Sequence, residues 1–314
     1  MIRILTSTSG TYSRKMSSIS SALHNVLEKM ETATSKRNKA VKEEMAVTPR
    51  LVAVSKTKPV SSIVEAYRSG QRHFGENYVN ELSQKSSDPE ILAECEDIRW
   101  HFIGHLQRNK SGVLISCPNL YMVETVESIK IANTLNKQWE SRNKQGKLRV
   151  MVQVNTSMED NKHGCNEEEM ASVVKEIKEN CPHLEFAGLM TIGSFNHDIT
   201  KGPNPDFLKL SRCRDKVCQE LQLEEQEVEL SMGMSGDYEH AIELGSTNVR
   251  IGSTIFGARE PKNPNVTKDN PDSQVNSGSG SKSNTSNTDN SQGNAESVLK
   301  AGEKLCQMSI GTSV

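Results

Sequence analysis

A lysine stands directly beyond an apolar, strand-forming run at residues 51–54. If Val52 and Val54 face a protein core, the two-residue period of a strand places Lys56 on the same face, at the carboxyl end of the strand. Partial burial favours the neutral amine, which is the nucleophilic form. The spacing therefore predicts a reactive lysine. The alternative is a lysine that covers apolar surface with its stem and keeps its amine in water.

Two turns rich in glycine and hydroxyl groups follow the last two apolar runs, at 231–237 (Ser-Met-Gly-Met-Ser-Gly-Asp) and 250–257 (Arg-Ile-Gly-Ser-Thr-Ile-Phe-Gly). Such turns, at the start of a helix, present backbone N–H groups and hydroxyls to a phosphate. The donors expected here are Ser235, Gly252, Ser253 and Thr254. The alternative is a pair of ordinary strand-to-helix turns that Ser and Asp cap.

Arg250 lies between two β-branched residues, Val249 and Ile251. If those two pack against helices, the alternation of a strand turns Arg250 to the opposite, interior face. A buried guanidinium needs an acceptor. We expect that acceptor to belong to a ligand, or else to a carboxylate at the end of a neighbouring strand.

One ligand class satisfies these three features together. Pyridoxal 5′-phosphate has an aldehyde for Lys56, a phosphate for the two turns, and a ring nitrogen for Arg250. An aspartate at the ring nitrogen would keep it protonated and make a strong electron sink. Arginine should leave the nitrogen unprotonated, which disfavours chemistry that passes through a full carbanion.

The elements that must position these residues alternate along the chain. Strand-like runs are expected at 51–55, 72–74, 99–103, 120–123, 148–154, 184–192, 227–231 and 248–251. Helical patterns are expected at 60–69, 77–86, 126–142, 167–180, 205–223 and 236–244, and the segments after Ile103 and Ile192 are less regular. Eight strand–helix units predict an α/β fold, a single (β/α)8 TIM barrel of parallel strands. An open doubly wound sheet is the alternative, although no GxGxxG follows the first strand.

The composition excludes several classes of function. The net charge is −2, with 38 Lys and Arg against 40 Asp and Glu, so nothing attracts nucleic acid or an anionic membrane globally. No run reaches the ~18 apolar residues of a spanning helix. The seven cysteines form no CxxC pair, which predicts reduced thiols in a reducing compartment and neither disulfides nor a metal site.

The N-terminal segment has no acidic residue before Glu28, and Arg3, Arg14 and Lys15 stand among many Ser and Thr. We expect residues 1–16 to form a flexible leader, and a cleaved transit peptide is the alternative. The first reading predicts a cytoplasmic protein, and the second a mitochondrial one. Residues 19–30 follow helical spacing, so a helix precedes the first strand. We place the barrel domain, with this helix, at 17–260.

The C-terminal segment at 261–314 consists mainly of Ser, Asn, Gly, Lys and Asp and contains no aromatic residue. It has too little apolar surface to offset its ordering entropy, which predicts a disordered tail with at most a weak helix at 295–310.

Six motifs together resemble the pyridoxal phosphate homeostasis proteins, also called proline synthase co-transcribed (YggS-like) proteins. They are Ala-Val-Ser-Lys-Thr-Lys-Pro at 53–59, Phe-Gly-Glu-Asn-Tyr at 74–78, Trp-His-Phe-Ile-Gly-His-Leu-Gln at 100–107, Gly-Leu-Met-Thr at 188–191, Leu-Ser-Met-Gly-Met-Ser at 230–235 and Val-Arg-Ile-Gly-Ser at 249–253. The resemblance runs from about residue 50 to Glu260. It implies a fold type III barrel like that of alanine racemase.

The resemblance also implies roles for individual residues. Lys56 would carry the cofactor as a Schiff base, Asn77 would lie near its ring, and Arg250 would face the ring nitrogen. Ser235, Gly252, Ser253 and Thr254 would hold the phosphate. Lys162, on the loop after the fifth strand, would assist cofactor exchange. The alternative is that Lys162 and His163 belong to a solvated loop without a function in the site.

The family is taken to bind, buffer and deliver the cofactor without turnover, which implies transient contact with apo-enzymes and a monomer or weak homodimer. A racemase of this fold has a second domain with a catalytic tyrosine, for which 261–314 offers no aromatic residue. An amino-acid racemase or decarboxylase is the enzymatic alternative, with Tyr78, His105 or His240 as its acid or base. A Schiff-base aldolase and a scaffold that binds no cofactor are further alternatives.

Overall fold

The computed structural model describes residues 18–40, 48–159, 162–194 and 197–258. The predicted leader at 1–16 and the predicted tail at 261–314, with its weak helix at 295–310, lie outside them. Within the described part, no helix is both long and apolar enough to cross a lipid bilayer.

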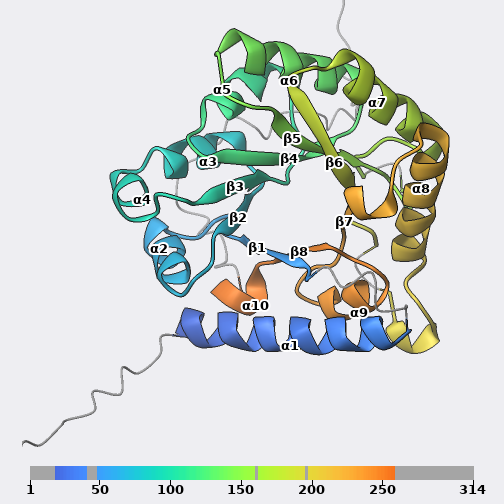
Figure 1. Cartoon of the computed structure of the whole chain (residues 1–314). Coiled ribbons are helices and arrows are strands. Elements are labelled where there is room, and N and C mark those ends of the chain that lie inside the picture. Colours follow the sequence, from blue (N-terminus) through green and yellow to red (C-terminus); the bar gives the residue numbers. More distant parts are fainter. Residues whose placement is uncertain (1–17, 41–47, 160–161, 195–196, 259–314) are drawn as a thin grey trace, which may run out of the picture. The chain divides into compact units, whose positions relative to one another are not determined.

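Eight parallel strands form a closed barrel, in which each strand pairs with the next along the chain and β1 pairs with β8 (Figure 1). The strands are β1 (Arg50–Val54), β2 (His73–Glu76), β3 (Arg99–Phe102), β4 (Leu120–Val126), β5 (Leu148–Gln153), β6 (Leu184–Met190), β7 (Glu229–Ser231) and β8 (Asn248–Ile251). Each predicted run overlaps one of them. The predicted (β/α)8 barrel is confirmed, and the open doubly wound sheet is wrong.

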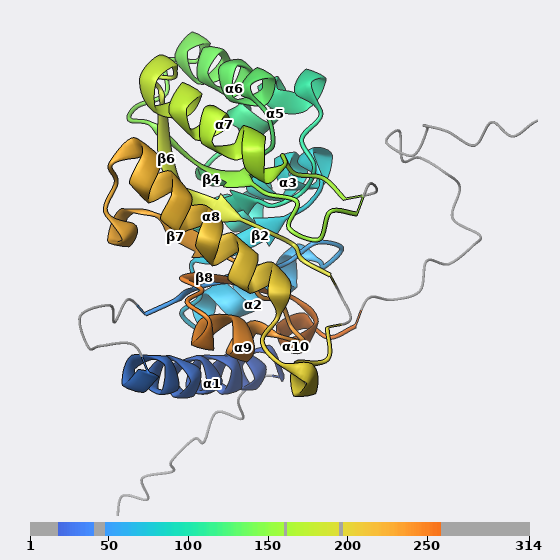
Figure 2. The ribbon, with the colours of Figure 1, turned by 90° about the vertical axis from the view of Figure 1, so that its right-hand side faces the viewer.

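Helices cover the outside of the barrel; most lie between successive strands, while the first helix precedes β1 and the last follows β8 (Figures 1 and 2). They are α1 (Ser18–Ala40), α2 (Val60–Arg68), α3 (Val79–Ser86), α4 (Pro89–Glu94), α5 (Ser111–Ser116), α6 (Ile129–Ser141), α7 (Glu167–Asn180), α8 (Pro205–Leu221), α9 (Tyr238–Glu243) and α10 (Ser253–Phe256). Short 3-10 helices are η2 (Arg108–Lys110), η3 (Ile199–Lys201) and η4 (Glu225–Glu227). The predicted helices agree with α2, α3, α6, α7, α8 and α9 within three residues at each end.

The N-terminal helix is longer than its apolar pattern indicated. The pattern loosens after Met30, but α1 continues to Ala40. Ala33 and Arg37 keep its inner face buried, and Arg37 Nη1 donates to the carbonyl of Ser246 at 3.2 Å. A long polar side chain thus continues the buried face, which an apolar count does not register.

The boundary between β4 and α6 also differs from the prediction. Val126, which we placed in the helix, is the last residue of β4. The helix begins at Ile129 because the side chain of Ser128 caps it, accepting from the N–H of Ile131. The irregular segments after Ile103 and Ile192 contain short helices, whose few residues give no readable period.

Strand side chains alternate between the helix shell and the interior of the barrel. Val249 and Ile251 belong to the large core between strands and helices, as does Ala53. Arg250 pairs in register with Val52, and the alternation of the strands turns both side chains away from the helices and into the barrel. The predicted interior position of Arg250 is therefore confirmed.

The helix α1 packs on α9 and α10, beside the place where the last strand meets the first (Figures 1 and 2). Lys29 and Lys36 reach Glu239 and Glu243 of α9 at 3.3 and 3.1 Å. These exposed pairs contribute little, about 0–1 kcal/mol each. Burial of the apolar face of α1 is what holds this helix to the barrel.

The carboxyl ends of β2 and β3 approach one another closely. The N–H of Ile103 donates to the carbonyl of Glu76 at 2.9 Å. A Cβ atom added at Gly104 would lie 1.9 Å from the carbonyl oxygen of Asn77, so only glycine fits. The glycine thereby allows the position of Asn77, a predicted site residue.

Gly104→Ala should lower the free energy of unfolding by about 1–3 kcal/mol, the usual cost of overpacking, because backbone rather than a flexible side chain must move. Gly236→Ala is the matched control, since a Cβ there meets no atom within 4 Å. Its effect should stay within about 0.5 kcal/mol. Urea denaturation measures both. Equal midpoints for Gly104→Ala and the unaltered protein would contradict the close approach.

Candidate functional site

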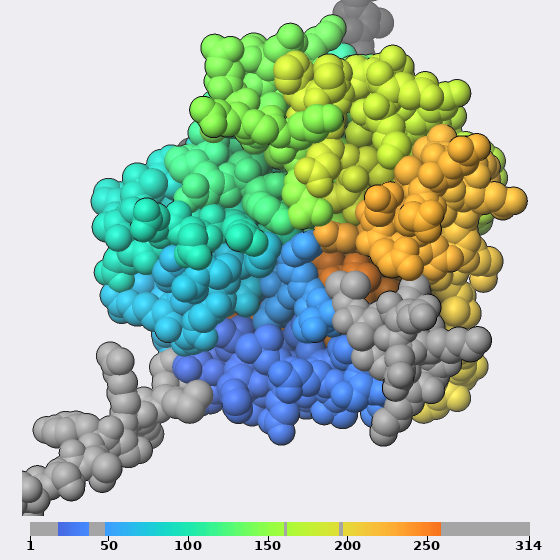
Figure 3. All heavy atoms as spheres, viewed as in Figure 1, coloured from blue at the N-terminus to red at the C-terminus, as the bar shows by residue number. Residues whose placement is uncertain are grey.

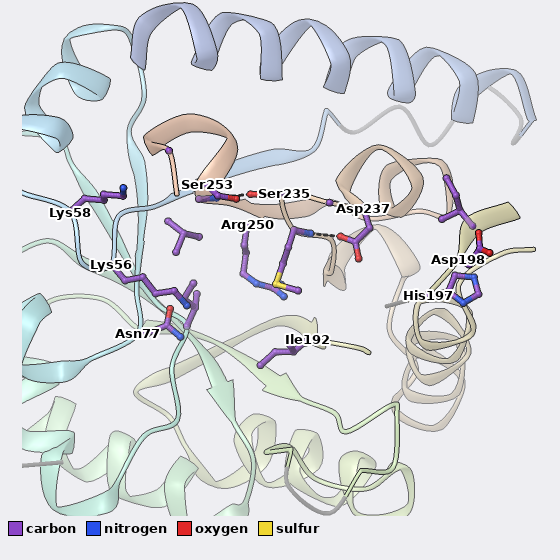
Figure 4. A pocket seen from close by; sticks show the side chains of 17 residues that line it. Lys56, Lys58, Asn77, Ile192, His197, Asp198, Ser235, Asp237, Arg250 and Ser253 are labelled. Carbon is purple, nitrogen blue, oxygen red and sulfur yellow. Dashed lines mark hydrogen bonds between the residues drawn. The ribbon is translucent and has the colours of Figure 1, made fainter. Parts of the chain in front are cut away.

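A cavity of about 730 Å³ lies at the carboxyl ends of the strands, where barrel enzymes build their sites (Figure 4). Six of the seven residues predicted to bind the cofactor line it: Lys56, Asn77, Ser235, Arg250, Gly252 and Ser253. The space-filling view shows a hollow in which atoms of the last strands (dark orange) lie beside the segment that follows β1 (Figure 3). Residues from both ends of the barrel sequence therefore meet here.

Lys56 reaches the cavity from a constrained turn after β1. The next residue, Thr57, has φ +63°, a left-handed conformation that is unfavourable for a β-branched side chain. Its N–H donates to the carboxylate of Glu81 at 2.6 Å. Lys85 Nζ, which is buried, donates both to Glu81 and to the carbonyl of Ser55, at 2.7 and 2.8 Å. These bonds fix the backbone on both sides of Lys56.

Glu76 lies beneath this turn and is completely buried. Its Oε1 accepts from Ser55 Oγ at 2.6 Å and from Lys85 Nζ at 2.8 Å, while its Oε2 has no hydrogen-bond partner among the described residues. Burial raises the pKa of Glu76 to about 7, against the opposing effect of Lys85. The carboxyl group is therefore a support for the turn and not a permanent charge next to Lys56.

Arg250 is held inside the barrel by two hydrogen bonds. Its Nη1 donates to Ser231 Oγ at 2.5 Å, and its Nη2 donates to the carbonyl of Thr191 at 2.8 Å. Ser231 Oγ in turn donates to Glu124 Oε2 at 2.5 Å. The carboxylate expected as the alternative partner of Arg250 thus exists, one hydroxyl away, and the guanidinium still lines the cavity.

Glu124 is the buried negative charge that balances Arg250. Its Oε1 lies 2.6 Å from His101 Nδ1 and accepts from Asn248 Nδ2 at 3.1 Å. Burial alone would raise the pKa of Glu124, but His101, Arg250 and Ser231 together lower it to about 2. Burial lowers the pKa of His101, so the ring is neutral and donates Nδ1–H to the carboxylate.

The turns after β7 and β8 are joined to each other. The N–H of Gly252 donates to Ser235 Oγ at 3.2 Å. Asp237 stands before α9 but does not cap it; its carboxylate accepts from the N–H of Met234 at 2.6 Å and fixes the turn instead. Burial raises the pKa of Asp237, while the bond to Met234 and the charge of Arg250 oppose that shift.

Thr254 is exposed and does not line the cavity, because α10 begins at Ser253 and turns the next side chain outward. Lys162 is not among the lining residues either. Its Nζ donates to Glu159 Oε1 at 2.6 Å and to the carbonyl of Gly193 at 2.9 Å.

Sequence reasoning missed part of the cavity wall. His197, Asp198 and Ile199 come from the loop after β6, and Lys58 and Asp237 complete the polar lining. The loop residues carry no periodic signal. Asp237 carries a different signal, since it ends the Ser-Gly-Asp turn, but that turn also suits an ordinary helix cap.

The three side chains expected as acid or base in an enzyme do not line the cavity. Tyr78 is half exposed at the rim. His240 Nε2 accepts from the N–H of Asn204 at 3.1 Å. His105 stacks on His163, with ring centroids 3.7 Å apart. His197 does line the cavity, and its Nε2 lies 2.9 Å from the carbonyl of Gly202.

Known proteins resemble this chain over the barrel. The family model described as alanine racemase, N-terminal domain, matches residues 32–260. A pyridoxal phosphate homeostasis protein of Homo sapiens is 53% identical over 239 residues, which cover 76% of this chain and 86% of the relative. A protein of the same name from Haemophilus influenzae is 40% identical over 76% of this chain and 94% of its own length.

Solved structures agree with this result. PipY of Synechococcus elongatus, solved with PLP bound, matches with a TM-score of 0.59 and 26% identity, over 71% of this chain and 100% of its own. An alanine racemase of Clostridium difficile matches with a TM-score of 0.52 and 13% identity, over 77% of this chain and 59% of its own. The second likeness shows a shared barrel fold.

Glu124→Gln should destabilise the protein by about 3–5 kcal/mol at pH 7, because it leaves the Arg250 charge buried without its counter-charge. The pKa of Glu124 in the folded protein is below its ordinary value of 4.5. Its contribution is therefore complete above about pH 5 and is lost as the pH falls from 4.5 towards 2. Urea denaturation at pH 7, 5 and 3.5 should show the difference between the two proteins shrinking with acidification.

Glu185→Gln serves as the control for that measurement. Glu185 is 52% exposed and lies 3.4 Å from Arg149, so its loss should cost at most about 1 kcal/mol. A Glu124→Gln protein as stable as the control at pH 7 would show that Glu124 does not balance Arg250.

Proposed function

The chain belongs to the pyridoxal phosphate homeostasis protein family, and we propose that it binds pyridoxal 5′-phosphate in the rim cavity and delivers it to other proteins. One observation carries the proposal: Lys56 and Arg250 reach a single cavity from the paired strands β1 and β8. We propose that Lys56 holds the aldehyde carbon as a Schiff base. The relative solved with PLP bound supports the choice of ligand.

The other polar groups of the cavity fit a phosphorylated ring. Ser235, Gly252 and Ser253 offer hydroxyls and backbone donors, on the turns where barrels usually bind phosphate. Asn77 Oδ1 is buried and has no hydrogen-bond partner among the described residues, so this oxygen can accept a hydrogen bond from a ligand. Arg250 supplies the donor for a ring nitrogen. The set offers one group for each part of the cofactor.

We further propose that the protein stores the cofactor and does not use it for turnover. Pyridoxal phosphate supplies an electron sink, which is strongest when its ring nitrogen is protonated. Arg250 is a charged donor balanced by Glu124, so it disfavours that protonated state. Among the described residues, His197 supplies the one imidazole in the wall, and its Nε2 lies 2.9 Å from the carbonyl of Gly202. The amino-acid racemase or decarboxylase is the alternative.

Delivery requires a transient encounter with apo-enzymes, and we propose these as the partners of the protein. We propose that its oligomeric state is a monomer or a weak homodimer.

We propose a cytoplasmic location, because the six cysteines in the described ranges are all free and buried. Free buried thiols suit a reducing compartment.

Lys56→Ala should abolish the visible absorbance that added pyridoxal phosphate gives the protein, because the remaining groups bind the cofactor without a covalent link. Lys58→Ala is the matched control. Lys58 lines the same cavity, but its Nζ donates to the carbonyl of Ala258 at 2.9 Å, so the band should persist. Loss of the band in Lys58→Ala alone would move the attachment to Lys58.

Delivery is tested with the loaded full-length protein, an apo form of a pyridoxal-phosphate enzyme, and a phosphatase that destroys free cofactor. Reactivation of the apo-enzyme should exceed that obtained with an equal amount of free cofactor. The same protein incubated with alanine or lysine should give no racemised or decarboxylated product. Product formation at a steady rate would support the enzymatic alternative and contradict storage.

A further inference from the structure

Two histidines and a glutamate form a compact group at the barrel rim, outside the lining of the cofactor cavity. His105 follows β3, Glu127 follows β4 and His163 lies on the loop after β5, so three adjacent strands each contribute one side chain. Their nearest ligand atoms all lie within 4.8 Å of one another. None of the three lines the cavity, and none has a role in the proposed cofactor site.

We propose that His105, Glu127 and His163 form a binding site for a divalent transition-metal ion, and specifically for Zn²⁺. Two imidazoles and one carboxylate are a ligand set that zinc accepts, with the fourth tetrahedral position left to water. The set contains no thiolate, and its two imidazoles suit zinc better than they suit Mg²⁺ or Ca²⁺, which prefer oxygen ligands.

The three side chains would need to move only a little to surround a zinc ion. Ligand atoms of a tetrahedral zinc with bonds of about 2.0–2.1 Å lie roughly 3.3 Å apart. His105 Nδ1 is already 3.3 Å from Glu127 Oε1, and His163 Nδ1 is 3.8 Å from the other carboxylate oxygen, Oε2, so the carboxylate must turn before one oxygen and both nitrogens surround the same ion. The two rings are nearly parallel, at 13°, so one must rotate before both nitrogens point at a common ion. The side chain of His163 is 55% exposed, which leaves room for that rotation.

The backbone under each histidine is firmly held. Thr125 Oγ1 donates to the carbonyl of Gly104, the residue before His105, at 2.7 Å. Gln153 Nε2 donates to the carbonyl of His163 at 2.9 Å. Gly164 has φ +123° and lies so close to the end of β5 that a Cβ would be 2.7 Å from the N–H nitrogen of Asn155. Binding would therefore require rotation of the side chains but no movement of the backbone at Gly104, His163 or Gly164.

The full-length protein, freed of metal by chelator dialysis, is titrated with Zn²⁺ by calorimetry in the presence of excess Mg²⁺. We expect one zinc per chain. His105→Ala and His163→Ala should each weaken binding by about 100-fold or more, since loss of merely supporting groups already costs 10–100-fold. His183→Ala is the matched control. His183 also faces a glutamate, Glu140 at 3.6 Å, but no third ligand lies near this pair in the described part of the chain, so the variant should bind zinc as the unaltered protein does.

A spectroscopic measurement separates this site from binding to cysteine. The X-ray absorption spectrum of the zinc-loaded protein should show nitrogen and oxygen neighbours at about 2.0–2.1 Å and no sulfur at about 2.3 Å. Sulfur neighbours, absence of zinc uptake, or uptake that persists in both histidine variants would each overturn the proposal. None of these results depends on pyridoxal phosphate, so failure here leaves the proposed function standing.

Discussion

The charge of Arg250, buried inside a closed barrel, is the constraint on which the site depends. A guanidinium there is tolerated only with acceptors and a counter-charge, and Ser231, Thr191 and Glu124 supply them. The polar chain continues through His101 to His73, whose Nδ1 lies 2.8 Å from His101 Nε2. The interior of the barrel is therefore organised around one ionic network, which fixes the guanidinium before any ligand arrives.

A second buried group of polar side chains fixes the turn that carries Lys56. Lys85 and Glu76 lie beneath the turn after β1, and with Glu81 they hold Thr57 in a conformation that this residue type rarely adopts. The two networks position the amine of Lys56, just after β1, and the guanidinium of Arg250, on β8, and these two strands pair with each other. Arginine and aspartate at a ring nitrogen have opposite effects on its protonation. An arginine in this place is one reason why we propose a protein that stores the cofactor.

Much of this could be predicted from the sequence, because strand alternation and the carboxyl-end rule are local and general. They placed Lys56 at the rim and Arg250 in the interior, and they indicated the turns of Ser235 and Gly252. Alternation says less about the turns beyond the strands: Thr254, on the short helix α10, is exposed and does not line the cavity, so its contact with the phosphate stays a prediction. The loop of His197 and Asp198 could not be found, since its position comes from the loop's path and not from any period.

The most direct test of the account is where the cofactor becomes attached. The purified protein is loaded with pyridoxal phosphate, reduced with borohydride, digested and mapped by mass spectrometry. We expect one pyridoxyl group per chain, on the peptide that contains Lys56, with Lys58 and Lys162 unmodified. Modification of another lysine, or none after loading, would contradict the convergence of Lys56 and Arg250 on a single cofactor.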